Sequence, residues 1–206
     1  MTGNADQRAR GARLPRSVRR SQLIDAAREV FVANGYHAAA MDDIAERAGV
    51  SKPVLYQHFP GKLELYLALL DEGTERLVSV VRDALASTED NKERVGATMG
   101  AYYDFVTGNQ GVFKLVFESD LTSEPAVRER VDAANRRCAD LVTEVIAEDA
   151  GLSTHEAHLL AVGLTGLAQV SARAWTSTDS KVPREVAVSL ISTLAWRGIR
   201  GFPRKG

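Results

Sequence analysis

The stretch Met41–Lys62, MDDIAERAGVSKPVLYQHFPGK, decides the fold of this 206-residue chain. It contains two short helical segments separated by a glycine, and Pro60-Gly61 ends the second one. In the first segment Ile44 and Ala48 are four residues apart, so both lie on one face of a helix. Gly49 supplies the positive φ angle at which a helix ends at little cost. The stretch therefore predicts two short helices joined by a tight turn.

The second segment has the features of a helix that begins after Ser51 and buries one side. The Ser51 hydroxyl is expected to cap it, and Pro53 follows in the first turn, where its missing N–H costs nothing. Leu55 and Phe59 form the inner side. The outward residues are Lys52, Val54, Tyr56, Gln57 and His58. This pattern predicts a helix-turn-helix whose second helix enters the DNA major groove, the alternative being an ordinary helical hairpin with a solvated outer face.

The candidate DNA contacts divide by chemistry into those to bases and those to phosphates. We expect base-edge contacts from Lys52, Pro53, Val54 and Gln57. We expect phosphate contacts from Ser51, Tyr56, His58 and Lys62. Lys62 opens the next predicted helix, which is an unusual place for a cation because helix N-termini favour anions. A phosphate docked beside Lys62 would explain it.

The segment from Arg20 to Leu70 resembles the DNA-binding domain of the TetR family of bacterial transcriptional regulators. The matching residues are Ile24, Ala27, Phe31, Gly35-Tyr36, Asp43-Ile44-Ala45, Ala48-Gly49-Val50-Ser51, Leu55-Tyr56, His58-Phe59, Lys62 and Leu65. The resemblance also implies the phosphate contact of Lys62. One departure is Ala39-Ala40, where the family usually has Ser or Thr before the first helix of the motif. A cap and a phosphate contact are therefore missing there, or Asp42 replaces the cap.

Charge is unevenly distributed along the chain. Residues 1–62 contain ten Lys and Arg against six Asp and Glu, a net charge of +4, whereas the whole chain has a net charge of −1. A basic N-terminal part is what DNA binding by one end requires. The first twenty residues contain six arginines: Arg8, Arg10, Arg13, Arg16, Arg19 and Arg20. Residues 1–16 are interpreted as a flexible basic arm that contacts the phosphate backbone or the minor groove, the alternative being a tail of no consequence.

The composition predicts a cytoplasmic protein that does not enter the membrane. Its single cysteine, Cys138, cannot form an intrachain disulfide, which fits a reducing compartment. The first twenty residues lack the apolar core of a signal peptide. The longest stretch without Asp, Glu, Lys or Arg is Ala157–Ala172, and its 16 residues are too few to span a bilayer.

Helical periodicity continues through the rest of the chain, and no segment alternates with period two, so we predict an all-α fold. A DNA-binding domain is predicted over 17–62, and a helical regulatory and dimerisation domain over 63–206. Helices are predicted over Ser17–Asn34, Lys62–Ser87, Asn91–Thr107, Val112–Ser119, Pro125–Ala150, Thr154–Ser177 and Pro183–Arg200. Ser153 and Glu156 have the spacing of a capping box.

Aromatic residues concentrate in the predicted regulatory domain. The candidates for ligand contacts are Tyr102, Tyr103, Phe105, Phe113, Phe117, Gln169 and Trp175. They either fill the core of a helical bundle or line an apolar cavity with a few polar groups, as in small-molecule sites. The family resemblance favours the cavity, because TetR-like proteins bind inducers in a pocket of this kind.

The last two predicted helices carry more apolar surface than one side of a small bundle can bury. The candidates for a subunit interface are Leu159, Val162, Gly163, Gly166, Val170, Leu190 and Leu194. The two glycines allow another helix to approach closely. The resemblance implies the same outcome, a homodimer in which these helices of two subunits form a four-helix interface.

No constellation in the sequence predicts an enzyme, a cofactor or a metal site. His155 and His158 flank Glu156 near a helix start, but further metal ligands are not close in sequence, so a solvated helix end is favoured. Glu118 and Asp120 have no partner that would suggest acid–base catalysis. Nucleotide-binding, nucleophile-elbow and zinc-protease motifs are absent from the sequence.

These features predict a homodimeric regulator that binds a pseudo-palindromic DNA operator. By family resemblance, we expect a repressor that a small apolar ligand releases by tilting the helix that begins at Lys62. One alternative is a DNA-binding protein that needs no ligand and whose aromatic residues are only core. Another, of a different class, is a helical small-molecule carrier or enzyme with a vestigial helix-turn-helix.

Overall fold

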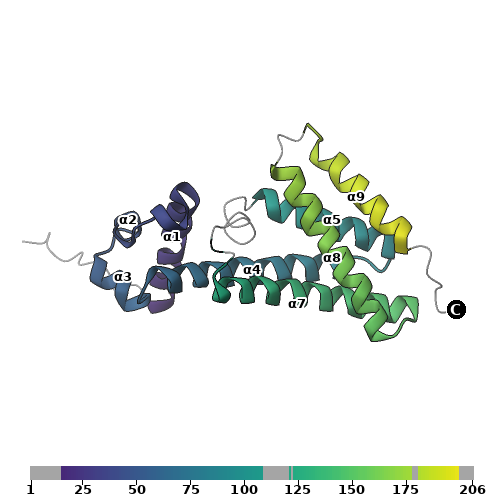
Figure 1. The fold of residues 1–206 in the computed structure, drawn as a ribbon, viewed down its shortest axis with the longest axis horizontal. Helices are drawn as coiled ribbons and strands as arrows, with labels where there is room; N and C mark the ends of the chain where they lie inside the picture. Colours follow the sequence, from purple (N-terminus) through teal and green to yellow (C-terminus); the bar gives the residue numbers. More distant parts are fainter. Residues whose placement is uncertain (1–14, 109–120, 122, 178–180, 200–206) are drawn as a thin grey trace, which may run out of the picture. The chain divides into compact units, whose positions relative to one another are not determined.

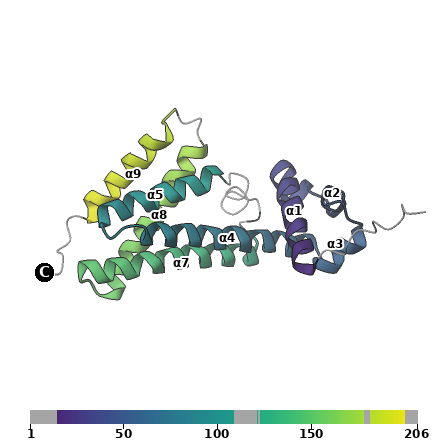
Figure 2. The same cartoon turned by 180° about the vertical axis from the view of Figure 1, so that it is seen from behind.

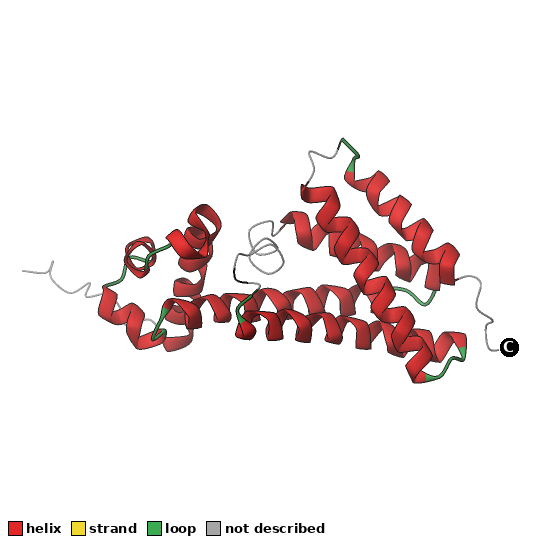
Figure 3. Ribbon diagram, in the orientation of Figure 1, coloured by secondary structure: helices red, strands yellow, loops and turns green. Residues whose placement is uncertain are grey.

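A computed structural model describes residues 15–108, 121, 123–177 and 181–199. These residues form eight helices and contain no strand (Figures 1 and 3). The helices are α1 (Arg16–Ala38), α2 (Met41–Arg47), α3 (Lys52–His58), α4 (Lys62–Ala86), α5 (Asn91–Gly108), α7 (Pro125–Ala150), α8 (Thr154–Ser177) and α9 (Arg184–Ile199). The predicted all-α fold is confirmed. The helix predicted over Val112–Ser119 lies outside the described residues.

The chain divides into two compact units, Met1–Tyr66 and Leu67–Gly206. The first unit contains α1, α2, α3 and the first residues of α4. The second contains the rest of α4 and the helices α5 to α9. The sequence predicts this boundary at residue 62.

The first unit has a core built from one face of each helix. On α1, Leu23, Ala27 and Phe31 are buried at helical spacing. The Phe31 ring meets the Tyr66 ring edge-on, with 5.3 Å between ring centres, and stacks on Tyr36 at 5.8 Å. This aromatic cluster ties α1 to the start of α4.

Gly35 interrupts α1 at the place where the sequence predicts its end. Its φ of 74° and ψ of 167° are not helical, so Arg16–Ala38 is two helical pieces separated by a kink. The second piece extends to Ala38, beyond the predicted end, and the Ala39 N–H donates to the Gly35 carbonyl over 3.2 Å. Glycine tolerates this φ because it has no Cβ.

In the second unit α4 and α7 run side by side, as both orientations show (Figures 1 and 2). Two ion pairs join them. Arg130 Nε lies 2.8 Å from Asp71 Oδ1, and the Arg137 guanidinium contacts both carboxylate oxygens of Glu75. α7 packs against α8, and α5 packs against α8 and α9.

The ends of α7 and α8 follow local rules, and both helices have their predicted bounds. α7 begins at Pro125 and ends before Gly151, which has a φ of 65°. At the start of α8, the Ser153 N–H donates to Glu156 Oε2 over 2.9 Å, and the Glu156 N–H donates to Ser153 Oγ over 3.4 Å. The predicted capping box is confirmed.

Candidate nucleic-acid interface and ligand cavity

The α2–turn–α3 segment is a compact helix-turn-helix. Gly49 has a φ of 64°, and the Val50 N–H closes the turn by donating to the Ala45 carbonyl over 3.0 Å. The Gln22 amide in α1 donates to the Ala48 carbonyl over 2.8 Å. Ala45 and Ala48 are buried. Their small side chains therefore let the helices of the motif approach closely.

One side of α3 is buried and the other faces solvent. Leu55 and the adjoining Phe59 belong to the core, whereas Tyr56 is 41% exposed. The predicted DNA-contact residues of this segment are all exposed or half-buried: Ser51, Lys52, Pro53, Val54, Tyr56, Gln57 and His58. The outer side thus presents a cation, an amide, hydroxyls and apolar surface, the groups that read base edges and bind phosphates.

Predictions about the starts of α2 and α3 need correction. The Ser51 side chain makes no capping hydrogen bond with α3. The N-cap residue of α2 is Ala40, and no side chain caps that helix either, so Asp42 does not replace the missing cap. Asp42 instead forms an ion pair with Lys52, with 2.7 Å between Oδ1 and Nζ. Because both side chains are exposed, this pair is weak enough for Lys52 to exchange it for DNA.

Lys62 opens α4 with its ammonium group on backbone carbonyls. Its Nζ donates to the carbonyl oxygens of Tyr36, His37 and Ala39 over 2.8, 3.2 and 2.9 Å. The Nζ also lies 4.5 Å from the centre of the Tyr36 ring. These carbonyls follow the kink at Gly35 and belong to the last residues of α1 or to its C-cap. Carbonyls at a helix end lack N–H partners within the helix, so they can accept hydrogen bonds from Lys62. The contacts account for a cation at this position without a phosphate, so the phosphate contact stays a prediction.

The Lys62→Met variant tests this assignment. Methionine keeps most of the apolar stem but removes the donor shared by three carbonyls. We expect the first unit to lose about 1–3 kcal/mol of unfolding free energy, measured by urea denaturation. If phosphate binding were the main role, stability would stay unchanged and the salt dependence of DNA binding would decrease.

Arginines from the start of α1 lie near the C-terminal end of α3. The Arg20 guanidinium carbon is 4.6 Å from the centre of the Phe59 ring. Burial, followed by the charges of Arg16, Arg19 and Arg20, holds the pKa of His58 below its ordinary value of 6.5. His58 is therefore mostly neutral at pH 7 in the free protein. The arginines add positive charge beside α3, the predicted recognition helix.

A phosphate contact by His58 predicts proton-linked DNA binding. A phosphate raises the pKa of a neighbouring imidazole, so binding would take up a proton and tighten as the pH falls from 7.5 to 5.5. An increase of one unit in the pKa corresponds to about tenfold in affinity for each subunit. We expect His58→Gln to flatten the pH dependence in fluorescence anisotropy and His37→Gln to preserve it. A His58→Gln protein that keeps the full dependence would contradict the contact.

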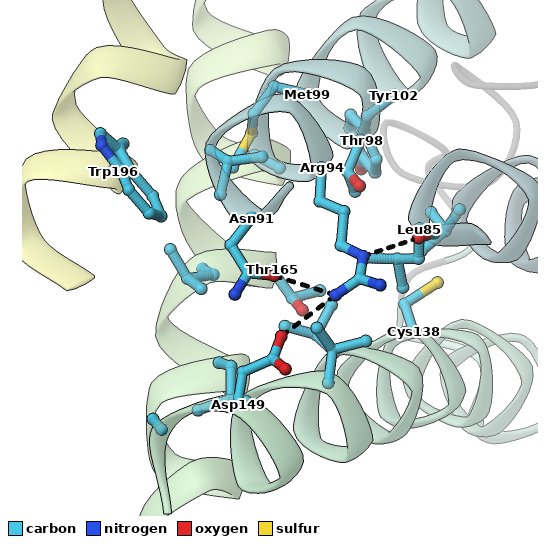
Figure 4. A pocket seen from close by; sticks show the side chains of 18 residues that line it. Leu85, Asn91, Arg94, Thr98, Met99, Tyr102, Cys138, Asp149, Thr165 and Trp196 are labelled. Atoms are coloured by element: carbon cyan, nitrogen blue, oxygen red, sulfur yellow. Dashed lines mark hydrogen bonds and ion pairs between the residues drawn. The ribbon is translucent and has the colours of Figure 1, made fainter. Parts of the chain in front are cut away.

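The second unit contains a cavity of about 340 Å³ whose lining comes from α4, α5, α7, α8 and α9 (Figure 4). This volume is in the range of small-molecule sites, roughly 300–1,000 Å³. Most of the lining is apolar and includes Val81, Leu85, Met99, Val142, Ile146 and Trp196. The cavity suits a ligand whose buried part is mainly hydrocarbon.

Arg94 is the charged centre of the cavity lining (Figure 4). Its Nη1 donates to Asp149 Oδ2 over 3.0 Å and to Asn91 Oδ1 over 2.9 Å. Its Nε donates to the carbonyls of Leu85 and Thr88 over 3.1 and 2.8 Å. Arg94 thereby joins the end of α4 to α5 and α7, and its charge is compensated within the protein.

A second, more polar groove of about 660 Å³ lies between α5 and α9. It contains the basic side chains of Lys92, Arg184 and Arg197, together with Glu185, and Arg184 Nε lies 2.6 Å from Asp104 Oδ1. Trp196 lines both the groove and the apolar cavity. The second unit therefore places an apolar cavity next to a basic groove.

The predicted ligand residues are mostly not at this cavity. Among those that the structure describes, only Tyr102 lines it. Tyr103 and Trp175 pack together with 5.3 Å between ring centres, and the Tyr103 hydroxyl donates to Ser171 Oγ over 3.0 Å. Four of the predicted residues line neither this cavity nor the groove, so their ligand contacts stay a prediction: Tyr103, Phe105, Gln169 and Trp175. Phe113 and Phe117 lie outside the described residues.

Apolar side chains on α8 and α9 extend into solvent. The exposed fractions are 73% for Leu159, 49% for Val162, 67% for Val170, 61% for Leu190 and 60% for Leu194. Gly163 is exposed and Gly166 is half-buried on α8. These are the residues predicted for a subunit interface, and exposed apolar surface of this kind typically marks a protein-binding site.

Comparison with known proteins identifies the family. The sequence pattern described as "Bacterial regulatory proteins, tetR family" matches residues 23–69. The HTH-type transcriptional activator FasR of Mycolicibacterium smegmatis is 48% identical over 194 residues, covering 94% of this chain and 89% of the relative. The chain belongs to the TetR family. It is a helix-turn-helix transcriptional regulator.

Solved structures agree with the TetR fold. The TetR-like transcriptional regulator from Rhodococcus sp. RHA1 is 27% identical, with a TM-score of 0.72 and coverage of 92% of this chain and 100% of that one. FadR of Bacillus subtilis, solved in complex with stearoyl-CoA, has a TM-score of 0.66 at 21% identity and shares the fold. The matched region covers 85% of this chain and 96% of the FadR chain.

Sequence reasoning missed most of the cavity lining of this TetR-family chain. Arg94, Thr98 and Tyr102 follow one another at intervals of four residues, and all three line the cavity from one face of α5. The repeat of these polar residues at intervals of four along α5 was the available signal. Cys138, the single cysteine, is buried and also lines the cavity.

Within the described residues, no group of three or more His, Cys, Asp or Glu side chains could hold a metal ion. His158 Nδ1 lies 3.8 Å from Asp140 Oδ1, and both side chains are largely exposed. Glu118 and Asp120 lie outside the described part of the chain. No described helix has the length and apolar character needed to cross a membrane.

Proposed function

We propose that this TetR-family regulator binds a pseudo-palindromic operator as a homodimer and that a ligand in the apolar cavity controls the binding. The observation that carries the proposal is the cavity of about 340 Å³ in a chain that also presents an exposed recognition helix. Ligand control requires that the ligand bind one conformation of the regulator better than another. Operator binding places the protein in the cytoplasm, with the chromosome.

The homodimer is proposed from the exposed apolar faces of α8 and α9. Leu159, Val170 and Leu190 would be covered by the same faces of a second copy, as in an isologous two-fold interface. Two recognition helices would then read two half-sites. Base edges are assigned to Lys52, Pro53, Val54 and Gln57, and phosphates to Ser51, Tyr56 and His58, with Arg16, Arg19 and Arg20 nearby.

A long-chain acyl thioester is the ligand class that we propose. FadR of Bacillus subtilis was solved with stearoyl-CoA, and it shares the fold of this chain. The apolar cavity suits the acyl chain, and Lys92 and Arg197 in the adjoining groove suit an anionic headgroup. Trp196 lies where the two meet.

Activation is the direction of control that we propose, in place of the repression expected from the sequence. The relative of 48% identity over 94% of this chain is named a transcriptional activator. A reporter gene placed behind the operator should give more product with the regulator than without it. Lower expression in the presence of the regulator would restore the repressor hypothesis.

The decisive experiment measures DNA binding with and without stearoyl-CoA. Labelled DNA from the upstream region of the gene is titrated with the full chain, and anisotropy is followed across a salt series. We expect sequence-dependent binding with a steep salt slope and a change in Kd on adding stearoyl-CoA. At 100 times its Kd, a ligand raises the unfolding free energy by about 2.7 kcal/mol, which a thermal melt detects.

Two tryptophan variants provide the control. Leu164→Trp adds bulk at the cavity lining and should abolish the response to stearoyl-CoA while DNA binding persists. Glu148→Trp adds the same side chain at an exposed position on α7. It should change neither DNA binding nor the response to stearoyl-CoA. If stearoyl-CoA has no effect on the unmodified protein, this ligand class is wrong. If the protein binds stearoyl-CoA but no DNA even at low salt, it is a carrier.

A further inference from the structure

Two hydroxyl groups of α5 belong to the apolar cavity. Thr98 and Tyr102 are one helical turn apart, and both line it (Figure 4). The oxygens Thr98 Oγ1 and Tyr102 Oη are buried, and neither has a hydrogen-bond partner in the part of the chain that the structure describes. Tyr102 as a whole is only 4% exposed.

Most comparable hydroxyls in this unit are satisfied. Tyr103, the next residue on α5, donates to Ser171 Oγ, and Thr107 donates to the Tyr103 carbonyl over 3.0 Å. Thr165, another cavity residue, donates to the Ala161 carbonyl over 2.8 Å. Two neighbouring buried hydroxyls without hydrogen-bond partners lower the stability of the free protein. Folding alone therefore does not explain why these two residues carry hydroxyls, whereas a ligand that bonds to them would.

The surroundings of the pair select a neutral partner. Burial and the neighbouring Cys138 raise the pKa of Tyr102, so its hydroxyl stays a neutral donor. Burial also raises the pKa of the Cys138 thiol to about 11, which keeps that group uncharged. The one cation in the described lining, Arg94, is already paired with Asp149. A carboxylate at the pair would therefore lose its hydration without gaining a counter-ion.

We propose that Thr98 and Tyr102 form a polar subsite that binds a neutral oxygen acceptor, such as a carbonyl, within the buried part of the ligand. The proposal rests on the proposed ligand function of the same cavity. The Tyr102 hydroxyl donates to the acceptor. Thr98 joins it after rotation about χ1, for which threonine in a helix has two common states. The subsite would distinguish oxygen-bearing chains from plain hydrocarbon.

The test compares Thr98→Val/Tyr102→Phe with the unmodified full-length protein. The probes are stearoyl-CoA and a series of ketostearoyl-CoA thioesters in which the keto oxygen is moved along the chain. We expect the double variant to lose about tenfold in affinity for at least one probe, measured by calorimetric titration. Loss for stearoyl-CoA itself would assign the acceptor to the thioester carbonyl. Loss confined to one keto position would assign it to the chain.

A readout without ligand separates this role from a structural one. Removing unsatisfied hydroxyls should raise the melting temperature of the free protein or leave it unchanged. The matched control is Tyr103→Phe, which breaks a satisfied hydrogen bond, and should lower the melting temperature while affinities persist. A lower melting temperature for Tyr102→Phe, or unchanged affinities for every probe, would overturn the proposal. If the unmodified protein binds none of the thioesters, the proposed ligand class fails first and the subsite falls with it.

Discussion

Replacing Leu190 and Leu194 by glutamate is expected to convert the protein into a monomer that no longer binds its operator tightly. Both leucines are at least 60% exposed on α9 and would be covered in the proposed dimer. Each subunit would bury two carboxylates that have no hydrogen-bond or ion-pair partner. The free energy of removing these charges from water exceeds the free energy that burying an apolar interface provides. Because the surface is exposed in the single chain, each subunit should keep its fold.

The effect on DNA binding should be large because the two recognition helices act together. When they are linked in one dimer, the second half-site is bound at a high effective concentration. Loss of this linkage should weaken operator binding by about 100- to 10,000-fold. The measurements are sedimentation velocity for mass and anisotropy for DNA affinity, with circular dichroism to verify the helical content.

The control for charge is Arg136→Glu, an exposed substitution on α7 that also changes the net charge of each subunit by −2. It should leave both the mass and the operator affinity near those of the unmodified protein. A Leu190→Glu/Leu194→Glu protein that sediments as a dimer would show that the subunits associate through another surface.

The second prediction separates base reading from phosphate binding on α3. Gln57 and Tyr56 are neighbours, and both are exposed. Gln57→Ala should cost about 1–3 kcal/mol for each half-site on the cognate operator and little on a scrambled sequence, because a base contact carries discrimination. Tyr56→Phe removes only a hydroxyl and should weaken binding to both sequences alike.

The measurement is the Kd for scrambled DNA divided by the Kd for operator DNA, both taken at one salt concentration. Gln57→Ala should reduce this ratio toward one, and single base changes in the operator should show the loss at one position in each half-site. Equal weakening on every sequence would assign Gln57 to the backbone. A changed ratio for Tyr56→Phe would assign the tyrosine to a base.

Local sequence determined the helices and the turn of the recognition motif. Gly49 and Gly35 have the positive φ angles for which glycine is suited, and Gly151 ends α7 in the same way. The capping box of Ser153 and Glu156 formed as its spacing predicted. All these features depend on residues within a few positions of one another. They therefore do not depend on contacts with distant parts of the chain.

Tertiary structure decided the partners that come from distant parts of the chain. Lys62 donates to carbonyls more than 20 residues earlier, and Asp42 pairs with Lys52 instead of capping α2. Tyr102 lines the cavity while its neighbour Tyr103 packs toward α8. Both are buried aromatic residues on one helix, but successive side chains point about 100° apart, and only the placement of the surrounding helices decides which of them meets the cavity.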